Sequence, residues 1–313
     1  MAAPNFADVI QSPQFTFFIG PEAKAIVVHA AAIAATSPQL NALINGGMAE
    51  SETRCVKMEH VGVDDFVRFC EYAYRGDYSV PAWEEEVVQV SQEQDQQQQH
   101  HEEEAEFPPA SSETGEEAVE TSHSQAPFPA FGRQAGGSYK KKGKIGWRER
   151  CAPEPPSRIQ LRALFNSRTY LPADGGPKAA MLQHFEPQAN SAADQDFTPV
   201  LLAHARLYCF AHLRLITPLK ALTLDKLHRT LMAFKLYTAR VGDIIALARY
   251  AYAHPDLPDR SDSGTLDELR KLVVEYVVCE IDTVGKCDAF CRYLEEGGEF
   301  VADFWRLARE YVA

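Results

Sequence analysis

The first third of the chain alternates apolar and polar residues in a way that predicts short strands and helices in a definite order. Two β-prone runs, QFTFFIG and KAIVVHA, are separated by the turn signal Gly20-Pro21 and predict a hairpin. An alanine-rich helix follows. Ser37-Pro38 then has the pattern of an N-cap with a first-turn proline, so a second helix begins there.

A further strand and helix complete this predicted unit. In RCVKMEHV, Val56 and Met58 alternate with polar residues, which is the period of a half-buried strand. The run VDDFVRFCEYAYRGDY places Phe66 and Phe69 on an apolar helix face and ends at Gly76, because glycine tolerates the left-handed cap. Residues 14–83 therefore predict a compact α/β unit.

The last part of the chain, residues 198–313, has helical periodicity nearly throughout. Thr198-Pro199 and Thr217-Pro218 each have the pattern of an N-cap and a first-turn proline ahead of an apolar stripe. VGDIIALARYAYAHP predicts a third helix, Thr265 with Glu268 fits a capping box, and EFVADFWRLAREYV predicts a final helix that must pack on its neighbours. No fixed repeat period is present, which favours an irregular helical extension over a solenoid.

The residues between these parts, 84–197, have a different composition. Thirteen of the 44 acidic residues lie between positions 84 and 120, and no Lys or Arg occurs from 84 to 132. The stretch QEQDQQQQHHEEEAE cannot bury enough apolar surface to offset its conformational entropy, so we expect a long, mostly disordered insertion. A basic tract follows, in which Lys140, Lys141, Lys142 and Lys144 form either a nuclear-localisation patch or part of a solvated linker.

Charge and composition limit the classes of function. The net charge is −13, and outside the acidic stretch the remaining acids balance the 31 bases, which argues against direct nucleic-acid binding. No apolar run approaches a membrane span, and the N-terminus lacks the features of a signal peptide. The seven scattered cysteines fit reduced thiols. We therefore expect an intracellular protein of the cytoplasm or the nucleus.

The patterns that enzymes need are missing from the sequence. It contains no nucleophile elbow, no P-loop, no dinucleotide-binding glycine motif and no His-Glu-x-x-His. His29 lies where a histidine caps or packs, and His204 and His212 have the wrong neighbours for a metal site. Cys287 and Cys291 share a helix face but lack further ligands, which favours two core-facing residues. We expect neither catalysis nor a metal or other cofactor.

The stretch GGMAES, residues 46–51, is unusual because it places an apolar Met48 in a loop between a helix and a strand. One interpretation is that Met48 folds back onto its own helix end as an apolar contact. The other is that Met48 inserts into an apolar pocket of a partner while Glu50 fixes the orientation through a basic group.

Several motifs, in matching order and spacing, resemble those of a BTB/POZ domain. They are FTFFIG, VHAAAIAATSPQLNALI, GGMAESETRCVKMEHV and FVRFCEYAYRGDY. The endings VGDIIALARYAY and EEGGEFVADFW are similar to those of fungal BTB proteins. The resemblance implies an α+β fold, a short β-sheet capped by helices, followed by an all-helical C-terminal extension, with the long disordered insertion between its parts.

The resemblance also sets the expected domain boundaries. Residues 14–83 form the first part of the BTB/POZ core, 84–197 the insertion, 198–235 the helices that complete the unit, and 236–313 the extension. The front and rear parts are then expected to share one apolar interior. A long insertion is tolerable there, because the entropy of loop closure grows only logarithmically with length.

For function, the resemblance implies protein–protein interaction, with self-association or binding of a cullin in ubiquitin ligases. Members that bind a cullin often carry an apolar-x-Glu element before a strand, and Met48-Ala49-Glu50 matches it. The chain departs from the transcription-factor type at Gln14 and Ala30, where that type has charged residues, and its N-terminal arm is short. An adaptor for a cullin-based ubiquitin ligase is therefore the leading hypothesis. The alternative is an oligomerising scaffold in chromatin or signalling.

Overall fold

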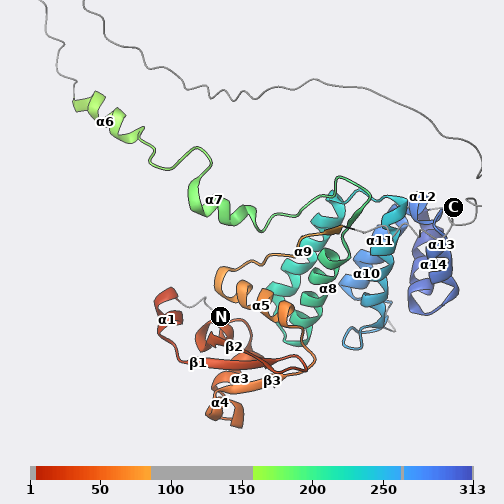
Figure 1. The fold of residues 1–313 in the computed structure, drawn as a ribbon, viewed down its shortest axis with the longest axis horizontal. Helices are drawn as coiled ribbons and strands as arrows, with labels where there is room; N and C mark the ends of the chain where they lie inside the picture. The colour runs from red at the N-terminus through yellow and green to blue at the C-terminus, as the bar shows by residue number, and fades with distance from the viewer. Residues whose placement is uncertain (1–4, 86–157, 262–263, 312–313) are drawn as a thin grey trace, which may run out of the picture. The chain divides into compact units, whose positions relative to one another are not determined.

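The computed structural model describes residues 5–85, 158–261 and 264–311 (Figure 1). It divides into two compact units, one formed by residues 1–88 and 171–313 and the other by residues 89–170. The first unit contains every strand and nearly all helices of the described residues. Most of the expected disordered insertion, residues 86–157, lies outside the described residues.

A small three-stranded sheet lies in the first unit, made of β1 (Gln14–Ile19), β2 (Lys24–His29) and β3 (Cys55–Met58) in the order β2-β1-β3. β1 and β2 form the predicted antiparallel hairpin, and β3 pairs parallel to β1. Alternate residues of β1, Phe15, Phe17 and Ile19, are buried. The period-2 pattern of the sequence therefore sets which face of the sheet is covered.

The helices of this front segment are α1 (Phe6–Gln11), α2 (Ala30–Ala34), α3 (Pro38–Asn45), α4 (Ala49–Thr53) and α5 (Val63–Arg75). The predicted cap at Ser37 is confirmed, since its side chain accepts a hydrogen bond from the Leu40 amide at 3.1 Å. Gly76 ends α5 with φ +77°, as predicted. Helix α1 has no counterpart in the predicted elements.

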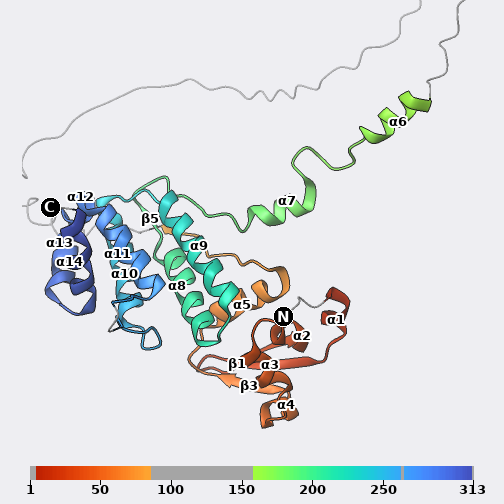
Figure 2. The same cartoon turned by 180° about the vertical axis from the view of Figure 1, so that it is seen from behind.

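Two long antiparallel helices, α8 (Thr198–Leu213) and α9 (Thr217–Ala233), pack beside the front segment (Figures 1 and 2). Phe210 of α8 contacts Phe69 and Phe66 of α5, with ring centroids 4.8 and 6.4 Å apart. One buried cluster joins the sheet and α5 to Leu207, Phe210, Ala211, Ile216 and Leu219. The front segment therefore shares one apolar cluster with α8 and α9, and the domain boundaries expected from the sequence stay a prediction.

The starts of α8 and α9 differ from the predicted ones by one residue. Thr198 and Thr217 are the first helical residues, and Phe197 and Ile216 occupy the N-cap positions without a side-chain cap. The Thr198 amide donates to the Asp196 carboxylate at 2.8 Å, so a carboxylate outside the helix takes the role predicted for the threonine hydroxyl.

The two ends of the predicted insertion meet. β4 (Glu84–Glu85) pairs antiparallel with β5 (Gln195–Asp196). Residues 171–197 belong to the same compact unit as the sheet and contain α7 (Gly176–Gln183) and the buried side chain of Phe185. The ordered unit therefore includes the last part of the segment that the sequence assigns to the insertion.

The predicted helical C-terminal region is confirmed. Its elements are η1 (Thr238–Arg240), α10 (Val241–Ala253), α11 (Glu268–Cys279), α12 (Ile281–Val284), α13 (Asp288–Glu295) and α14 (Glu299–Tyr311). They share a second apolar core with α8 and α9. The capping box at Thr265 was wrong, because Asp267 is the N-cap and accepts from the Leu269 amide at 2.9 Å.

The second unit is described by itself. Its described part holds α6 (Arg158–Asn166), whose apolar side chains are more than half exposed: Ile159, Leu161, Leu164 and Phe165.

Candidate partner-binding surface

The segment that carries Met48, Ala49 and Glu50 is a one-turn helix, α4, where the sequence predicted a loop. Gly46 ends α3, Gly47 turns the chain with φ +73°, and Met48 occupies the N-cap position of α4. The turn is closed by backbone hydrogen bonds from the Ser51 and Glu52 amides to the Met48 carbonyl at 2.9 and 3.1 Å. The Ser51 and Thr53 hydroxyls also donate to the Met48 and Ala49 carbonyls, at 2.7 and 2.8 Å.

Met48 points away from the protein core. Its exposed fraction is 59%, Ala49 is also exposed, and Glu50 is half-buried in the first turn of α4. Met48 is therefore not buried in the core, and its role as a partner contact stays a prediction. Glu50 makes no ion pair with any residue that the structure describes, so its carboxylate is available to a basic group.

The other sequence-derived candidates do not come together into a site. His29 bonds through Nδ1 to the Tyr74 hydroxyl at 2.9 Å, and His212 is half-buried on α8. Cys287 is half-buried and Cys291 is exposed, so the prediction that both face the core was wrong. Within residues 5–85, 158–261 and 264–311, no group of three His, Cys, Asp or Glu side chains could hold a metal ion.

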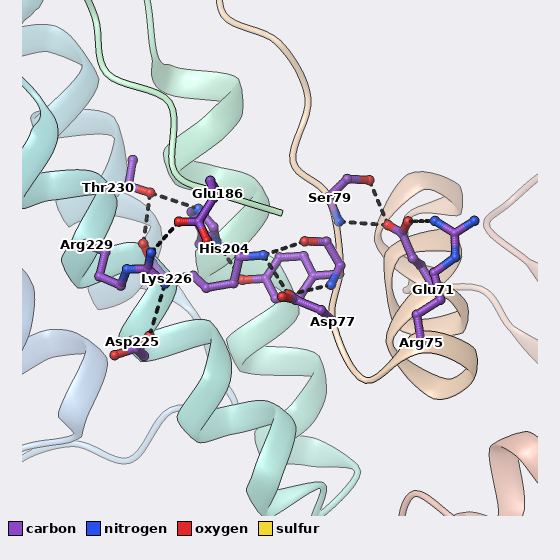
Figure 3. A network of polar contacts seen from close by, with 11 residues as sticks. Glu71, Arg75, Asp77, Ser79, Glu186, His204, Asp225, Lys226, Arg229 and Thr230 are labelled. Carbon is purple, nitrogen blue, oxygen red and sulfur yellow. Dashed lines mark hydrogen bonds and ion pairs between the residues drawn. The ribbon is translucent and has the colours of Figure 1, made fainter. Parts of the chain in front are cut away.

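A polar cluster joins the front segment to α8 and α9 at their junction (Figure 3). Lys226 of α9 is 3% exposed, and its ammonium donates to the Asp77 carboxylate at 2.7 Å and to the Tyr78 carbonyl at 2.6 Å. It also lies over the Tyr78 ring, 4.4 Å from the centroid. Tyr78, itself fully buried, continues the cluster by contacting His204 of α8 at 2.6 Å.

The hydrogen bonds of this junction define the state of His204. Thr230 donates its only hydroxyl proton to the Lys226 carbonyl at 2.8 Å, so the 3.3 Å contact to His204 Nε2 requires Nε2 to be the donor. Nδ1 then accepts from the Tyr78 hydroxyl. Burial, with the nearby Lys226 and Arg68 charges, lowers the pKa of His204 to about 3, which agrees with a neutral ring.

This junction predicts an acid-sensitive stability. Because the folded pKa of His204 is about 3 and its ordinary value is 6.5, the unfolded chain binds more protons between these pH values. Stability is therefore expected to fall as the pH drops below about 6.5, by up to ~1.4 kcal/mol per pH unit from this group. The measurement is urea denaturation at pH 7, 6 and 5.

A His204→Gln variant is the comparison for that measurement. Asp243 acts in the opposite direction, because burial raises its pKa to about 6 and the folded state then holds its proton. Since Asp243 is present in both proteins, the difference between their slopes isolates His204. Parallel stability curves for the two proteins would contradict the assigned neutral ring.

Sequence reasoning missed this junction, although a signal was present. Leu219, Thr223, Lys226 and Thr230 are spaced three or four residues apart, which places Lys226 on the inward stripe of α9.

The proposed nuclear-localisation patch, Lys140, Lys141, Lys142 and Lys144, lies outside the described residues and stays a prediction. Among the described helices, we find none with both the length and the apolar character that crossing a membrane requires.

Comparison with known proteins gives one family. The family model described as BTB/POZ domain matches residues 15–101. No curated protein matches the chain.

Proposed function

This chain contains a BTB/POZ domain, a family of protein–protein interaction modules, and we propose that it is a non-catalytic adaptor that docks a cullin scaffold of a ubiquitin ligase. The observation that carries this proposal is the exposed Met48 at the start of α4, two residues before an unpaired Glu50. An exposed methionine adapts its shape to an apolar pocket at low cost, and a neighbouring carboxylate adds orientation.

The geometry of α4 supports a preformed contact. Its turn is closed by backbone hydrogen bonds from the Ser51 and Glu52 amides to the Met48 carbonyl, and Arg54 leads into β3 with φ +52°. Little conformational entropy is then lost when a partner binds, which favours affinity.

The proposed docking predicts that Met48→Ala and Glu50→Ala each weaken binding of a purified cullin by about 10- to 100-fold, since central anchor residues cost 1–3 kcal/mol when truncated. Binding is measured by biolayer interferometry on the full chain. Matched controls are Met232→Ala, an exposed methionine on α9, and Glu52→Ala, an exposed acid on α4 itself. No cullin binding, or equal losses in the controls, would refute the adaptor role.

A scaffold that self-associates is the second candidate, favoured by α1. Phe6 and Ile10 of this helix are 71% and 46% exposed, while Val9 between them is buried. Exposed apolar side chains at this density suit a second protein surface. Light scattering over a wide concentration range on the same preparation distinguishes the candidates, because a strict monomer rules out self-assembly.

We also propose the domain division 14–83, 84–197, 198–235 and 236–313, with the BTB/POZ unit made from the first and third segments. The shared apolar cluster and the Lys226–Asp77 pair support joining those two segments.

A further inference from the structure

Helix α6 (Arg158–Asn166) carries a dense group of exposed apolar side chains. Leu161, Leu164 and Phe165 are 55%, 57% and 61% exposed, and Ile159 is 82% exposed, although the helix has only 9 residues. Single exposed apolar residues are common on protein surfaces, whereas a dense group of them marks an interaction site. Helix α6 is therefore a candidate contact for another molecule.

These apolar residues lie on two opposite faces of α6. Leu161, Leu164 and Phe165 are three and four residues apart, so they share one face. Because each residue turns the helix by about 100°, Ile159 lies on the opposite face. A helix that rests on a membrane surface has one apolar face and one charged face. Apolar residues on both sides fit a protein groove that encloses the helix.

The charged residues of α6 are all basic. Arg158 and Arg162 are four residues apart and lie between the two apolar faces, and Arg168 follows the end of the helix. No acidic residue occurs from 158 to 170, and none of these three arginines forms an ion pair within the described ranges. A complementary partner therefore carries carboxylates around an apolar groove.

We propose that α6 binds an acidic calcium-sensor protein, whose methionine-rich groove opens when Ca²⁺ binds and then closes around a basic amphipathic helix. Methionine side chains adapt to irregular apolar anchors, and such grooves take helices with anchors three and four residues apart. The basic character of α6 meets the acidic rim of the groove. Since α6 belongs to a different unit from α4, this inference does not rest on the proposed cullin docking.

The test titrates calmodulin, as the probe for this class of partner, into the full chain by isothermal titration calorimetry. Binding in Ca²⁺ that is lost in EDTA is expected, because the groove closes when the ion leaves. Leu161→Ala/Phe165→Ala is expected to weaken binding by about 10-fold or more, since a few buried anchors dominate the affinity of such contacts. Ile159→Ala is expected to weaken it by about 3- to 10-fold, because the opposite wall then loses its contact.

Two further variants separate charge from apolar contact. Arg158→Gln/Arg162→Gln is expected to weaken binding by about 3- to 10-fold at low ionic strength and less at high ionic strength, because salt screens exposed charges. Leu182→Ala, which changes a 47% exposed side chain on α7, is expected to bind like the unchanged chain. Since α6 lies outside the unit that holds the apolar cores, all variants of α6 are expected to keep the thermal unfolding midpoint of the unchanged protein.

The proposal is overturned if calmodulin does not bind in Ca²⁺, if it binds equally in EDTA, or if Leu161→Ala/Phe165→Ala binds fully. The last result would assign the contact to another part of the chain. Vesicles of phosphatidylserine and phosphatidylcholine are the parallel probe. If they capture the chain through α6 and calmodulin does not, α6 is a membrane contact and the proposal fails.

Discussion

Replacing Phe210 with alanine is expected to lower the free energy of unfolding by about 3–5 kcal/mol, the usual cost of removing a buried aromatic side chain. Phe210 is 7% exposed, and its ring lies against Phe69 and Phe66 from a segment more than a hundred residues earlier. The cavity left in Phe210→Ala would lie inside the cluster that joins the sheet to α8. The front and rear parts are therefore expected to lose stability together.

Urea denaturation followed by circular dichroism gives the loss of stability, and limited proteolysis shows whether the two parts open in one transition. The matched control is Leu213→Ala on the same helix, which is 44% exposed and is expected to cost much less, about 0.5–1 kcal/mol. If residues 14–83 of the Phe210→Ala variant stayed resistant to proteolysis while the rear helices were cleaved, the shared apolar cluster would not hold the two parts together.

Asp77→Ala is expected to cost about 2–3 kcal/mol, because it leaves the buried Lys226 ammonium without its carboxylate. This cost is lower than that of breaking a fully buried pair, because the Asp77 side chain is 30% exposed and Lys226 keeps its hydrogen bond to the Tyr78 carbonyl. Burial lowers the pKa of Lys226 and the nearby Asp77 raises it, so the variant is also expected to lower this pKa further.

Chemical denaturation at pH 7 checks this cost, with Asp225→Ala as the control. Asp225 is exposed on the same helix as Lys226 and lies 4.0 Å from Arg229, so its loss is expected to change stability by no more than about 0.5 kcal/mol. The double variant Asp77→Ala/Lys226→Met is expected to recover part of the loss, because it removes the unpaired charge. A double variant as unstable as the sum of its single changes would contradict this explanation.

The sequence predicted where the candidate site lies along the chain, but it did not predict the backbone conformation there. The position of Met48 between a helix and a strand was visible, but the helical turn of Ala49–Thr53 depends on a backbone already directed by Gly47. The exposure of Met48 was also undecided. A single methionine fits a core and a surface equally well until its neighbours are placed.

The sequence alone determined the three strands of the sheet, the ends of several helices and the α+β architecture, because these follow from short-range periodicity, caps and glycine stops such as Ser37 and Gly76. Tertiary structure alone decided which polar groups meet. Lys226 and Asp77 are 149 residues apart, and Tyr78 and His204 are 126 residues apart. Such pairings depend on how distant segments pack, and no local pattern encodes the distance between them.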